Sequence, residues 1–395
     1  MTCSTQTKVR RRVLHIGKFY PPHPGGMETH LQSMCNALKP WFDCEVIVAN
    51  ENHRSQVDII DGIPVTRLGV WFNIAGAPAC PAMPRAIARS RADLVHMQWP
   101  NPAAFLAYLL SGHRGPLIVS WQSDVIRQRV LNWLFTPVTR AVLRRAALIF
   151  ASSPDYAANS SMLREFADRV RIVPIGISEE NLGRTDSTGV AAIRSRYGSR
   201  IVLSVGRLVY YKGFEFLIRA AKSVDAVVLI IGEGQLKRQL ERKSIEQGVA
   251  DHVYLLGEVK DIVSYYQACD IFVLPSIARS EAFGIVQLEA MACEKPVINT
   301  RLSSGVPYVS LDDVTGITVP PADAQALADA INKLLADPEL RAAYGRAGLQ
   351  RVRQEFTVGR MAMRIRDLYE EALGVTSRNL GSSSEDLKVL PINQP

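Results

Sequence analysis

The stretch SEAFGIVQLEAMAC at residues 280–293 follows the apolar run IFVL at 271–274, and together they decide how this half of the chain folds. The apolar run is short and bounded by turn signals, as buried strands are. Gly284 permits a tight turn, and Ile285 begins a series of good helix formers. A strand, a glycine turn and a helix in this order predict one βα unit of a parallel sheet.

The same alternation of short apolar runs and amphipathic stretches continues toward both ends of the chain. Further candidate strands span residues 13–16, 44–49, 64–68, 94–97, 117–120, 148–151, 201–205, 227–231, 253–256 and 296–300. Helical patterns lie between many of them, at residues 28–38, 125–148, 214–223, 236–247, 286–292 and 324–336. This alternation predicts an α/β protein with parallel sheets covered by helices on both faces.

Two such series of similar size predict two doubly wound domains. The glycine-containing and polar segment 172–195 is the best candidate for the connection between them. We place the first domain at 1–178 and the second at 179–375, with the last helix a candidate to pack back on the first. Residues 376–395 lack periodicity and are predicted to form a mobile tail. Open parallel sheets bind ligands beyond the carboxyl ends of their strands, so two facing sheets would form a cleft at their junction.

Composition indicates which kinds of partner the chain binds and in which cell compartment it lies. The chain has 395 residues, 47% of them hydrophobic and 21% charged, and a formal net charge of +8. Residues 1–178 hold 20 basic and 11 acidic side chains, so the positive excess lies in the first half. This excess points to phosphates or an anionic membrane surface, whereas no zinc-finger spacing or RNP motif favours nucleic acid. Six scattered cysteines, no signal peptide and no long apolar run predict a cytoplasmic protein without a membrane span.

Two carboxylates bracket the start of the helix that follows Gly284. The free N–H groups at a helix start favour an anion, most simply a phosphate. Glu281 lies before the helix and Glu289 inside it, and eight helical residues rise about 12 Å, a span comparable to a nucleotide sugar from hexose to ribose. One carboxylate would then bind sugar hydroxyls and the other ribose hydroxyls. The alternative is a helix-start carboxylate and a solvated helix residue.

A second strand end carries two cations. In VGRLVYYKG at 205–213, Arg207 and Lys212 follow the first strand of the second domain and flank a turn. A planar guanidinium and a compact ammonium suit a diphosphate. Alone, they are equally consistent with two exposed charges on a loop.

Taken with these two stretches, six shorter motifs give the chain a family resemblance. They are KFYPPHPGGMETH at 18–30, VHMQW at 95–99, SSPDY at 152–156, VPIGI at 173–177, GEG at 232–234 and GITVPP at 316–321. In this order they resemble the retaining glycosyltransferases of family 4, and the resemblance covers roughly residues 12–370. It implies a GT-B fold of two facing Rossmann-like domains, with members that build bacterial surface polysaccharides such as lipopolysaccharide.

The resemblance also implies roles for individual residues. Glu281 would lie near the transferred sugar, Arg207 and Lys212 would neutralise the departing diphosphate, and Glu289 would hold the ribose. The other donor-binding positions that it implies are Phe283, Gly284, Ile285, Val286, Gly25, Gly26 and Val259. The first four would contribute backbone contacts, the glycine pair would let the first domain's backbone approach the donor, and the loop with Val259 would lie near the base. An ordinary turn is the alternative for the glycine pair.

One position departs from the family pattern. Many relatives carry a histidine after the strand at 117–121, where this chain has Gln122. Glutamine can donate and accept hydrogen bonds but cannot shuttle a proton at neutral pH. A role as a base is therefore doubtful, whereas a role in orienting the sugar survives. Asp124 is a possible base, although Ser123 or Asp124 would also serve as a helix cap.

The leading hypothesis is a hexosyltransferase that acts with retention on a nucleoside-diphosphate sugar and an acceptor hydroxyl. GDP-mannose is preferred on resemblance alone, and UDP-hexoses remain open, as does the lipid-linked or saccharide acceptor. No cofactor is expected, and no metal, because no cluster has metal-ligand spacing and the resemblance implies metal-independent catalysis. Basic and apolar residues mixed over 127–145 suggest contact with an anionic membrane, with a core-packed helix as the alternative.

Two other classes of function stay open at this point. A non-catalytic sugar-nucleotide-binding or membrane-scaffold protein would not need all four charged residues. A dinucleotide-dependent oxidoreductase would carry G-x-G-x-x-G after an early strand, and the first strand is followed by GKFYPP at 17–22 instead.

Overall fold

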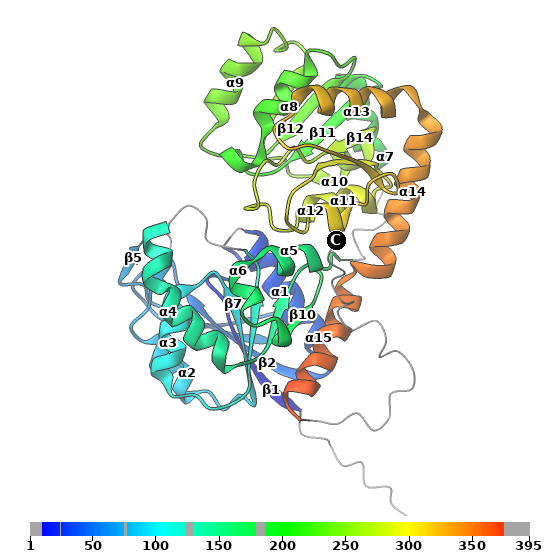
Figure 1. Ribbon diagram of the computed structural model, residues 1–395. Coiled ribbons are helices and arrows are strands. Elements are labelled where there is room, and N and C mark those ends of the chain that lie inside the picture. The colour runs from blue at the N-terminus through cyan, green and yellow to red at the C-terminus, as the bar shows by residue number, and fades with distance from the viewer. Residues whose placement is uncertain (1–9, 24, 75–76, 124–128, 179–185, 375–395) are drawn as a thin grey trace, which may run out of the picture. The chain divides into compact units, whose positions relative to one another are not determined.

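The computed structural model describes residues 10–23, 25–74, 77–123, 129–178 and 186–374 (Figure 1). Asp124, Arg127 and the predicted tail at 376–395 lie outside these ranges. The chain divides into two compact units, each described by itself below.

These two units differ from the predicted domains, which met at a single boundary between residues 178 and 179. Unit 1 comprises the described parts of Met1–Ala151, Ser160–Val173 and Met361–Pro395, and unit 2 those of Ser152–Asn159 and Pro174–Arg360. The chain therefore enters unit 2 for one short helix before it completes unit 1. Its last helix belongs to unit 1 from Met361 onward.

Unit 1 is built on an eight-stranded sheet in the order β10-β9-β8-β7-β1-β2-β4-β3. All neighbours pair in parallel except β3, which runs antiparallel to β4 at the edge. The strands are β1 (Arg11–Ile16), β2 (Phe42–Ala49), β3 (Gln56–Ile60), β4 (Ile63–Leu68), β7 (Leu94–Trp99), β8 (Leu117–Trp121), β9 (Ala146–Ala151) and β10 (Val170–Ile172). A separate antiparallel hairpin consists of β5 (Phe72–Ile74) and β6 (Ala77–Ala79).

Helices cover both faces of the unit 1 sheet, because the connections between parallel strands cross over it. The helical segments are α1 (Gly26–Leu38), α2 (Met83–Arg89), α3 (Pro102–Ser111), α4 (Arg129–Arg145), α6 (Ser161–Arg164), η1 (Ala167–Arg169) and the part of α15 (Val358–Ala372) from Met361. His96 of β7 bonds to Tyr369 of α15 on one face. Trp99, an odd number of residues further along the strand, contacts Phe105 of α3 on the other face.

Unit 2 has a six-stranded, wholly parallel sheet in the order β13-β12-β11-β14-β15-β16. Its strands are β11 (Ile201–Val205), β12 (Val227–Ile231), β13 (Val253–Gly257), β14 (Ile271–Val273), β15 (Val297–Thr300) and β16 (Gly316–Val319). Its helical segments are α5 (Pro154–Asn159), α7 (Ser187–Tyr197), η3 (Tyr210–Lys212), α8 (Phe214–Ala221), α9 (Lys237–Glu246), α10 (Ile262–Ala268), α11 (Ile285–Ala292), α12 (Val306–Val309), α13 (Ala324–Ala336) and α14 (Pro338–Glu355).

Alternate residues of the unit 2 strands pack in two separate hydrophobic cores. Leu203 of β11 packs in the cluster that includes residues of α7, α10, α11 and α14. Val202 packs in the cluster with residues of α8, α9 and α13. This is the period of two that a strand buried on both faces requires, and it places helices on both faces of the sheet.

Every strand predicted from an apolar run is present within one or two residues at its ends. The helix expected over 125–148 is shorter: α4 ends at Arg145, and β9 already begins at Ala146. Strands β3, β5, β6, β10 and β16 were missed, because none of them carries a long apolar run.

Two histidines, His15 and His96, lie in the core of unit 1, and a third, His30, is partly buried. His15 of β1 is fully buried, its ring lies 5.4 Å from that of His96, and neither of its nitrogens has a hydrogen-bond partner among the described residues. Burial lowers the pKa of His15 to about 3 and that of His30 to about 4. Folding therefore holds His15 neutral at a pH where the unfolded chain would bind a proton.

Replacing His15 with leucine should make the chain less sensitive to acid. Below pH 6.5 the unfolded wild type gains a proton that the folded state excludes. The free energy of unfolding therefore decreases as the pH is lowered, by about 2 kcal/mol between pH 6.5 and pH 5 for one such group. The His15→Leu variant loses this contribution, and its free energy of unfolding should exceed that of the wild type more at pH 5 than at pH 8. Urea unfolding at both pH values measures the difference. An equal difference at the two pH values would contradict the assignment.

Candidate active site

The strand order of unit 2 reverses between β11 and β14, because β12 and β13 lie on one side and β15 and β16 on the other. Chains that leave such a pair of strands diverge and open a crevice for ligands. The segment after β11 carries Arg207 and Lys212, and the segment after β14 carries Ser276 and Glu281. The switch point therefore collects the charged residues that the sequence singled out.

Lys212 and Glu281 form a buried ion pair across this switch point. Lys212 Nζ lies 2.6 Å from Glu281 Oε2, and each side chain is 10% exposed. Ser276 Oγ donates a second hydrogen bond, of 3.0 Å, to the same carboxylate oxygen. The sequence predicted Lys212 as a partner of a diphosphate, and it gave no indication of this pairing.

A glycine makes room for the lysine. Gly206 has a φ of 155°, and a Cβ there would lie 3.1 Å from both Cε and Nζ of Lys212. A side chain at this position would press on the lysine stem just behind its charge. The glycine at the end of β11 is thus part of what places the ammonium between the two strand ends.

Glu289 lies on the inward side of α11. It is partly buried, and its Oε2 accepts a 2.6 Å hydrogen bond from the hydroxyl of Tyr266 on α10. Burial raises the pKa of Glu289, while the Tyr266 hydrogen bond and the charge of Lys212 oppose the rise. Lys212 therefore acts on both carboxylates, and the alternative of a freely solvated Glu289 is wrong.

The start of α11 is held rigidly. Gly284 occupies the left-handed region with a φ of 75°, and a Cβ there would lie 2.7 Å from Leu274 Cδ2. Gln287, fully buried, donates to the Phe283 carbonyl, and Asn299 donates to Gln287 Oε1. Two buried amide side chains from neighbouring elements thus fix the turn that exposes the first N–H groups of the helix.

The remaining unit 2 positions contribute differently. The Arg207 side chain is exposed, donates to Tyr211 Oη at 3.2 Å, and pairs with no carboxylate among the described residues. The Phe283 side chain lies in the core, and Ile285, Val286 and Val259 pack against the same cluster. Any contact of these four with a ligand would therefore come mainly from their backbone.

In unit 1, Gly25 is the N-cap of α1 and Gly26 is its first residue, two residues before the helical pattern predicted over 28–38. Gly25 is exposed, its φ of 161° is extended, and a Cβ on it would lie 2.1 Å from Glu28 Oε2. The glycine lets the Glu28 carboxylate fold back against the helix start. Glu28 is 9% exposed, and sequence reasoning missed it, although an acid in the first helical turn is a usual signal.

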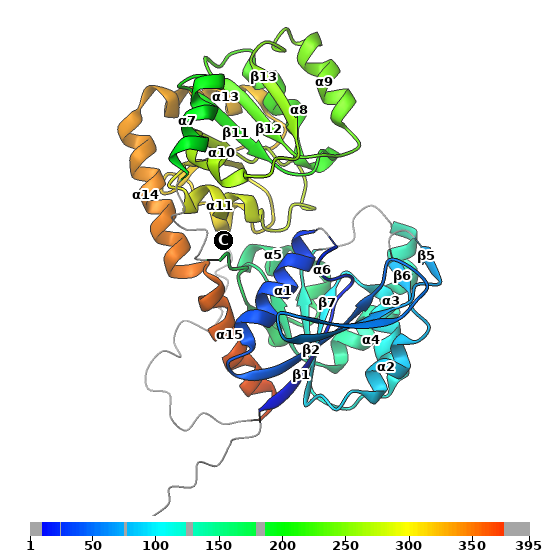
Figure 2. The same ribbon diagram turned by 180° about the vertical axis from the view of Figure 1, so that it is seen from behind.

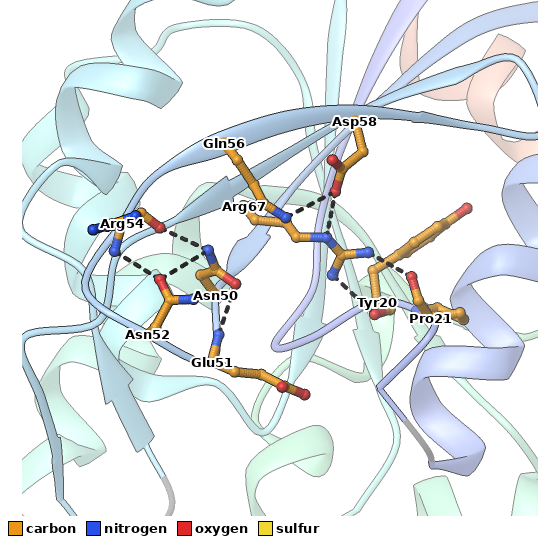
Figure 3. Close-up of polar contacts among 9 residues, drawn as sticks. All are labelled: Tyr20, Pro21, Asn50, Glu51, Asn52, Arg54, Gln56, Asp58 and Arg67. Carbon is orange, nitrogen blue, oxygen red and sulfur yellow. Dashed lines mark hydrogen bonds and ion pairs between the residues drawn. The ribbon is translucent and has the colours of Figure 1, made fainter.

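Arg67 of β4 fixes the loop that leads to this glycine pair (Figure 3). It is 7% exposed and donates to the carbonyls of Tyr20 at 3.0 Å and Pro21 at 2.5 Å, while its Nε donates to Asp58 at 2.8 Å. One guanidinium thus joins β4 and the edge strand β3 to the segment after β1. The only sequence signal was an arginine within a largely apolar strand.

Gln122 follows β8 with an unsatisfied amide. Both its side-chain nitrogen and oxygen are buried without a partner among the described residues, as is Nε2 of Gln98 on β7. Gln98 is in register with Ser120, so Gln98, Ser120 and Gln122 alternate onto one face of the sheet. Buried amide groups are normally paired, so this edge of unit 1 has capacity for polar ligand groups.

Comparison with known proteins defines the class. The family model for glycosyl transferases group 1 matches residues 191–351, and the model for a glycosyl transferase 4-like domain matches residues 25–176. The chain belongs to this glycosyltransferase family, and the predicted family, GT-B fold and hexosyltransferase activity are confirmed. The oxidoreductase hypothesis is thereby set aside.

Two relatives and one solved structure are most informative. A D-rhamnosyltransferase of Pseudomonas aeruginosa, WbpZ, is 31% identical over 88% of this chain and 92% of its own. The O-antigen chain mannosyltransferase C of Escherichia coli is 29% identical over 92% of this chain and 99% of its own. Sucrose-phosphate synthase from Thermosynechococcus elongatus has the same fold, with a TM-score of 0.79 at 22% identity over 93% of this chain and 100% of its own.

The structure thus gathers Lys212, Glu281 and Glu289 in unit 2, with Arg207 on the same turn as the lysine. Gln122 and the glycine pair lie in unit 1. No three His, Cys, Asp or Glu side chains are grouped as metal ligands in the described ranges, and metal independence stays a prediction. Among the described residues, no helix is long and apolar enough to cross a membrane.

Removing one member of the buried ion pair should cost stability. Lys212→Met leaves the Glu281 carboxylate buried without its cation, which should destabilise unit 2 by about 3 kcal/mol. In the double variant Lys212→Met/Glu281→Gln both members of the pair are neutral, and most of that stability should return while glycosyl transfer stays lost. Lys222→Met, an exposed lysine of the same unit, is the matched control and should change neither property. Urea unfolding and a transfer assay measure both. A double variant as unstable as the single one would argue against the ion pair.

Proposed function

We propose that this glycosyltransferase moves a mannosyl group from GDP-mannose, with retention and without a metal ion, to a hydroxyl of a lipid-linked or polysaccharide acceptor. Support for the sugar and the acceptor comes from the O-antigen mannosyltransferase and the rhamnosyltransferase among its relatives. Their names support mannose or a related sugar as the transferred group and, for the mannosyltransferase, an O-antigen chain as the class of acceptor. We keep the cytoplasmic face of the membrane as the predicted place of reaction.

The observation that carries the proposal is the position of Lys212 between two carboxylates at the switch point, beside the start of α11. A donor diphosphate at this place would meet a cation, the N–H groups after Gly284 and the exposed guanidinium of Arg207. These groups stabilise negative charge as it develops on the leaving phosphate oxygen. Positive side chains and a helix start supply the charge compensation that the departure needs.

The bond changes follow from this arrangement. The bond between the anomeric carbon and the diphosphate oxygen breaks with its electron pair leaving on the phosphate. The acceptor oxygen forms its bond to the same carbon from the same face, and its proton passes to the leaving phosphate oxygen. Glu281, held by Lys212 and Ser276, is placed to bind sugar hydroxyls and to stabilise positive charge on the sugar ring.

Glu289 and Gln122 complete the proposed contacts. A partly buried carboxylate that already accepts from Tyr266 has a second oxygen for ribose hydroxyls. The unsatisfied amide of Gln122 can donate to one sugar hydroxyl and accept from another. These contacts with the ribose and the sugar require no protein base, which agrees with glutamine in the place of the family's histidine.

A panel of nucleotides tests the donor. Calorimetric titration of the full chain with GDP, GDP-mannose, UDP and UDP-glucose should show guanine nucleotides binding at least about 10-fold more tightly, because GDP-mannose is the proposed donor. Tighter binding of UDP-glucose would replace the proposed donor with a UDP-hexose. No binding of any of the four would remove the sugar-nucleotide proposal altogether.

Arg207 is expected to act on turnover. Arg207→Ala removes the exposed guanidinium that faces the leaving diphosphate, and kcat/KM for transfer should fall roughly 100-fold or more. Arg219→Ala, an exposed arginine of α8 paired with Glu215, is the control and should leave kcat/KM near the wild-type value. The assay is run with EDTA, and the anomeric configuration of the product is read by NMR. Undiminished transfer by Arg207→Ala would overturn the role of this arginine. Loss of wild-type activity in EDTA would overturn metal independence, and an inverted product would overturn retention.

A further inference from the structure

The strand order of unit 1 also reverses, between β1 and β7, because β2, β4 and β3 follow on one side and β8, β9 and β10 on the other (Figure 2). The segments after β1 and β2 leave neighbouring parallel strands at the same edge of the sheet. Asn101, after β7, donates to the Gly17 carbonyl at 3.1 Å, and the Ala49 N–H donates to the Lys18 carbonyl at 3.0 Å. The segment after β1 is therefore bonded on both sides, at an edge where parallel sheets bind ligands.

A pair of titratable side chains joins the segment after β1 to the segment after β2. Nδ1 of His23 lies 2.8 Å from Oε1 of Glu51, and the two side chains are 29% and 68% exposed. An ionised carboxylate only accepts hydrogen bonds, so Nδ1 is the donor and Nε2 of the neutral ring keeps its lone pair. Among the described residues, Nε2 has no hydrogen-bond partner. The pair therefore presents an oriented hydrogen-bond acceptor that a ligand can reach.

Further contacts fix the direction of the His23 ring. The Phe19 ring is stacked on it, with 4.2 Å between the ring centres and 28° between the planes. The backbone N–H of His23 donates to the Tyr20 carbonyl at 3.2 Å and closes a turn. Lys18 Nζ lies over the Phe19 ring, 5.7 Å from its centre. A freely exposed side chain changes rotamer readily, whereas the stack, the turn and the carboxylate hold this one in place.

Buried polar side chains fix both segments that carry the pair (Figure 3). The two carbonyls that Arg67 binds lie two and three residues before His23. Asn50 is 7% exposed, accepts from the Glu51 N–H at 2.9 Å and donates to the Arg54 carbonyl at 2.6 Å. Breaking such buried hydrogen bonds is costly, because it leaves a desolvated group without a partner. The fold therefore positions both members of the pair.

A second histidine–carboxylate pair, in unit 2, serves as a comparison. Nδ1 of His252 lies 2.7 Å from Oδ1 of Asp251, and the histidine is 29% exposed, as His23 is. Its Nε2 lies 3.2 Å from the Ala221 carbonyl. Both ring nitrogens of His252 are thus used within the chain, and its partner is the preceding residue. His23 instead keeps one nitrogen for a ligand, and its partner comes from a different strand end.

We propose that the His23–Glu51 pair binds the acceptor sugar, with Nε2 of His23 accepting a hydrogen bond from a hydroxyl that does not react. An acceptor atom backed by a carboxylate suits a neutral hydroxyl group, whereas a phosphate offers only negatively charged acceptor oxygens. The inference rests on the proposed function for the identity of the ligand as an acceptor saccharide. The reacting hydroxyl still gives its proton to the leaving phosphate oxygen. By holding one hydroxyl of the ring, the pair limits which other hydroxyl reacts.

Binding of simple sugars tests the pair without a donor. Methyl glycosides of α-mannose, α-rhamnose, β-galactose and β-N-acetylglucosamine are titrated into the full chain, and dissociation constants are measured by saturation-transfer NMR. The wild type should bind at least one of them. His23→Leu should weaken that binding about 5- to 10-fold, the effect of one lost hydrogen bond. Glu51→Ala should do the same, because the ring then exchanges tautomers. Glu51→Gln keeps an acceptor for the Nδ1 proton and should stay within about 2-fold of the wild type.

The matched control is His252→Leu, which should bind the glycosides as the wild type does, and urea unfolding should show each variant folded. His23→Leu/Glu51→Ala should bind no more weakly than His23→Leu, because Glu51 acts through the histidine. No glycoside binding by the wild type, equal losses in His23→Leu and His252→Leu, or additive losses in the double variant would overturn the proposal. So would a loss of GDP affinity in His23→Leu as large as its loss of glycoside affinity. The nucleotide titrations of the wild type test the proposed donor separately, so the two proposals fail independently.

Discussion

The ion pair between Lys212 and Glu281 is the interaction on which the site depends. It joins the segment after β11 to the segment after β14, where the sheet's strand order reverses, and it is almost completely shielded from water. A lone charge in that place would be costly, because burial penalises an unpaired ion far more than a paired one. Gly206 gives the lysine room, Ser276 satisfies the carboxylate further, and the positive charge limits how far burial raises the pKa of Glu289. A group of ordinary residues thereby becomes a preorganised electrostatic site whose cation is already in position.

Sequence patterns predicted the architecture well because parallel strands buried on both faces are continuous apolar runs. The same patterns placed Arg207, Lys212 and Glu281 correctly at strand ends, since residues just after parallel strands meet at one edge. They could not show which charges pair with each other. Tyr266 donates a hydrogen bond to Glu289 from another helix, 23 positions away in the sequence. Arg67 donates to Pro21, in the loop before Gly25, from a strand 46 positions away. Partners of this kind are selected by packing and leave no periodic trace.

The surface of unit 1 shows the same distinction between composition and arrangement. The arginine-rich stretch that ends α4 has the alternation expected of an interfacial helix, yet Arg140 is occupied by Glu165 and the apolar residues beside it are buried. Among the described residues of unit 1, the large apolar side chains that do reach solvent come from strand β3, the hairpin and helices α3, α4 and α15, which are separated in sequence. A helical period identifies an apolar face without saying whether a neighbouring element covers it.

The chain crosses between its two units four times, at 151/152, 159/160, 173/174 and 360/361. A fragment cut at a single point in the middle would therefore be incomplete on both sides. The first half would lack the tyrosine that closes over the histidine core, and the second would lack the short helix that begins at Pro154. Exchanging halves between related enzymes to alter donor or acceptor choice would succeed only if the final helix travelled with the amino-terminal portion. The two units are therefore not two consecutive halves of the chain, and this connectivity limits how recombination of whole domains could have diversified the enzyme.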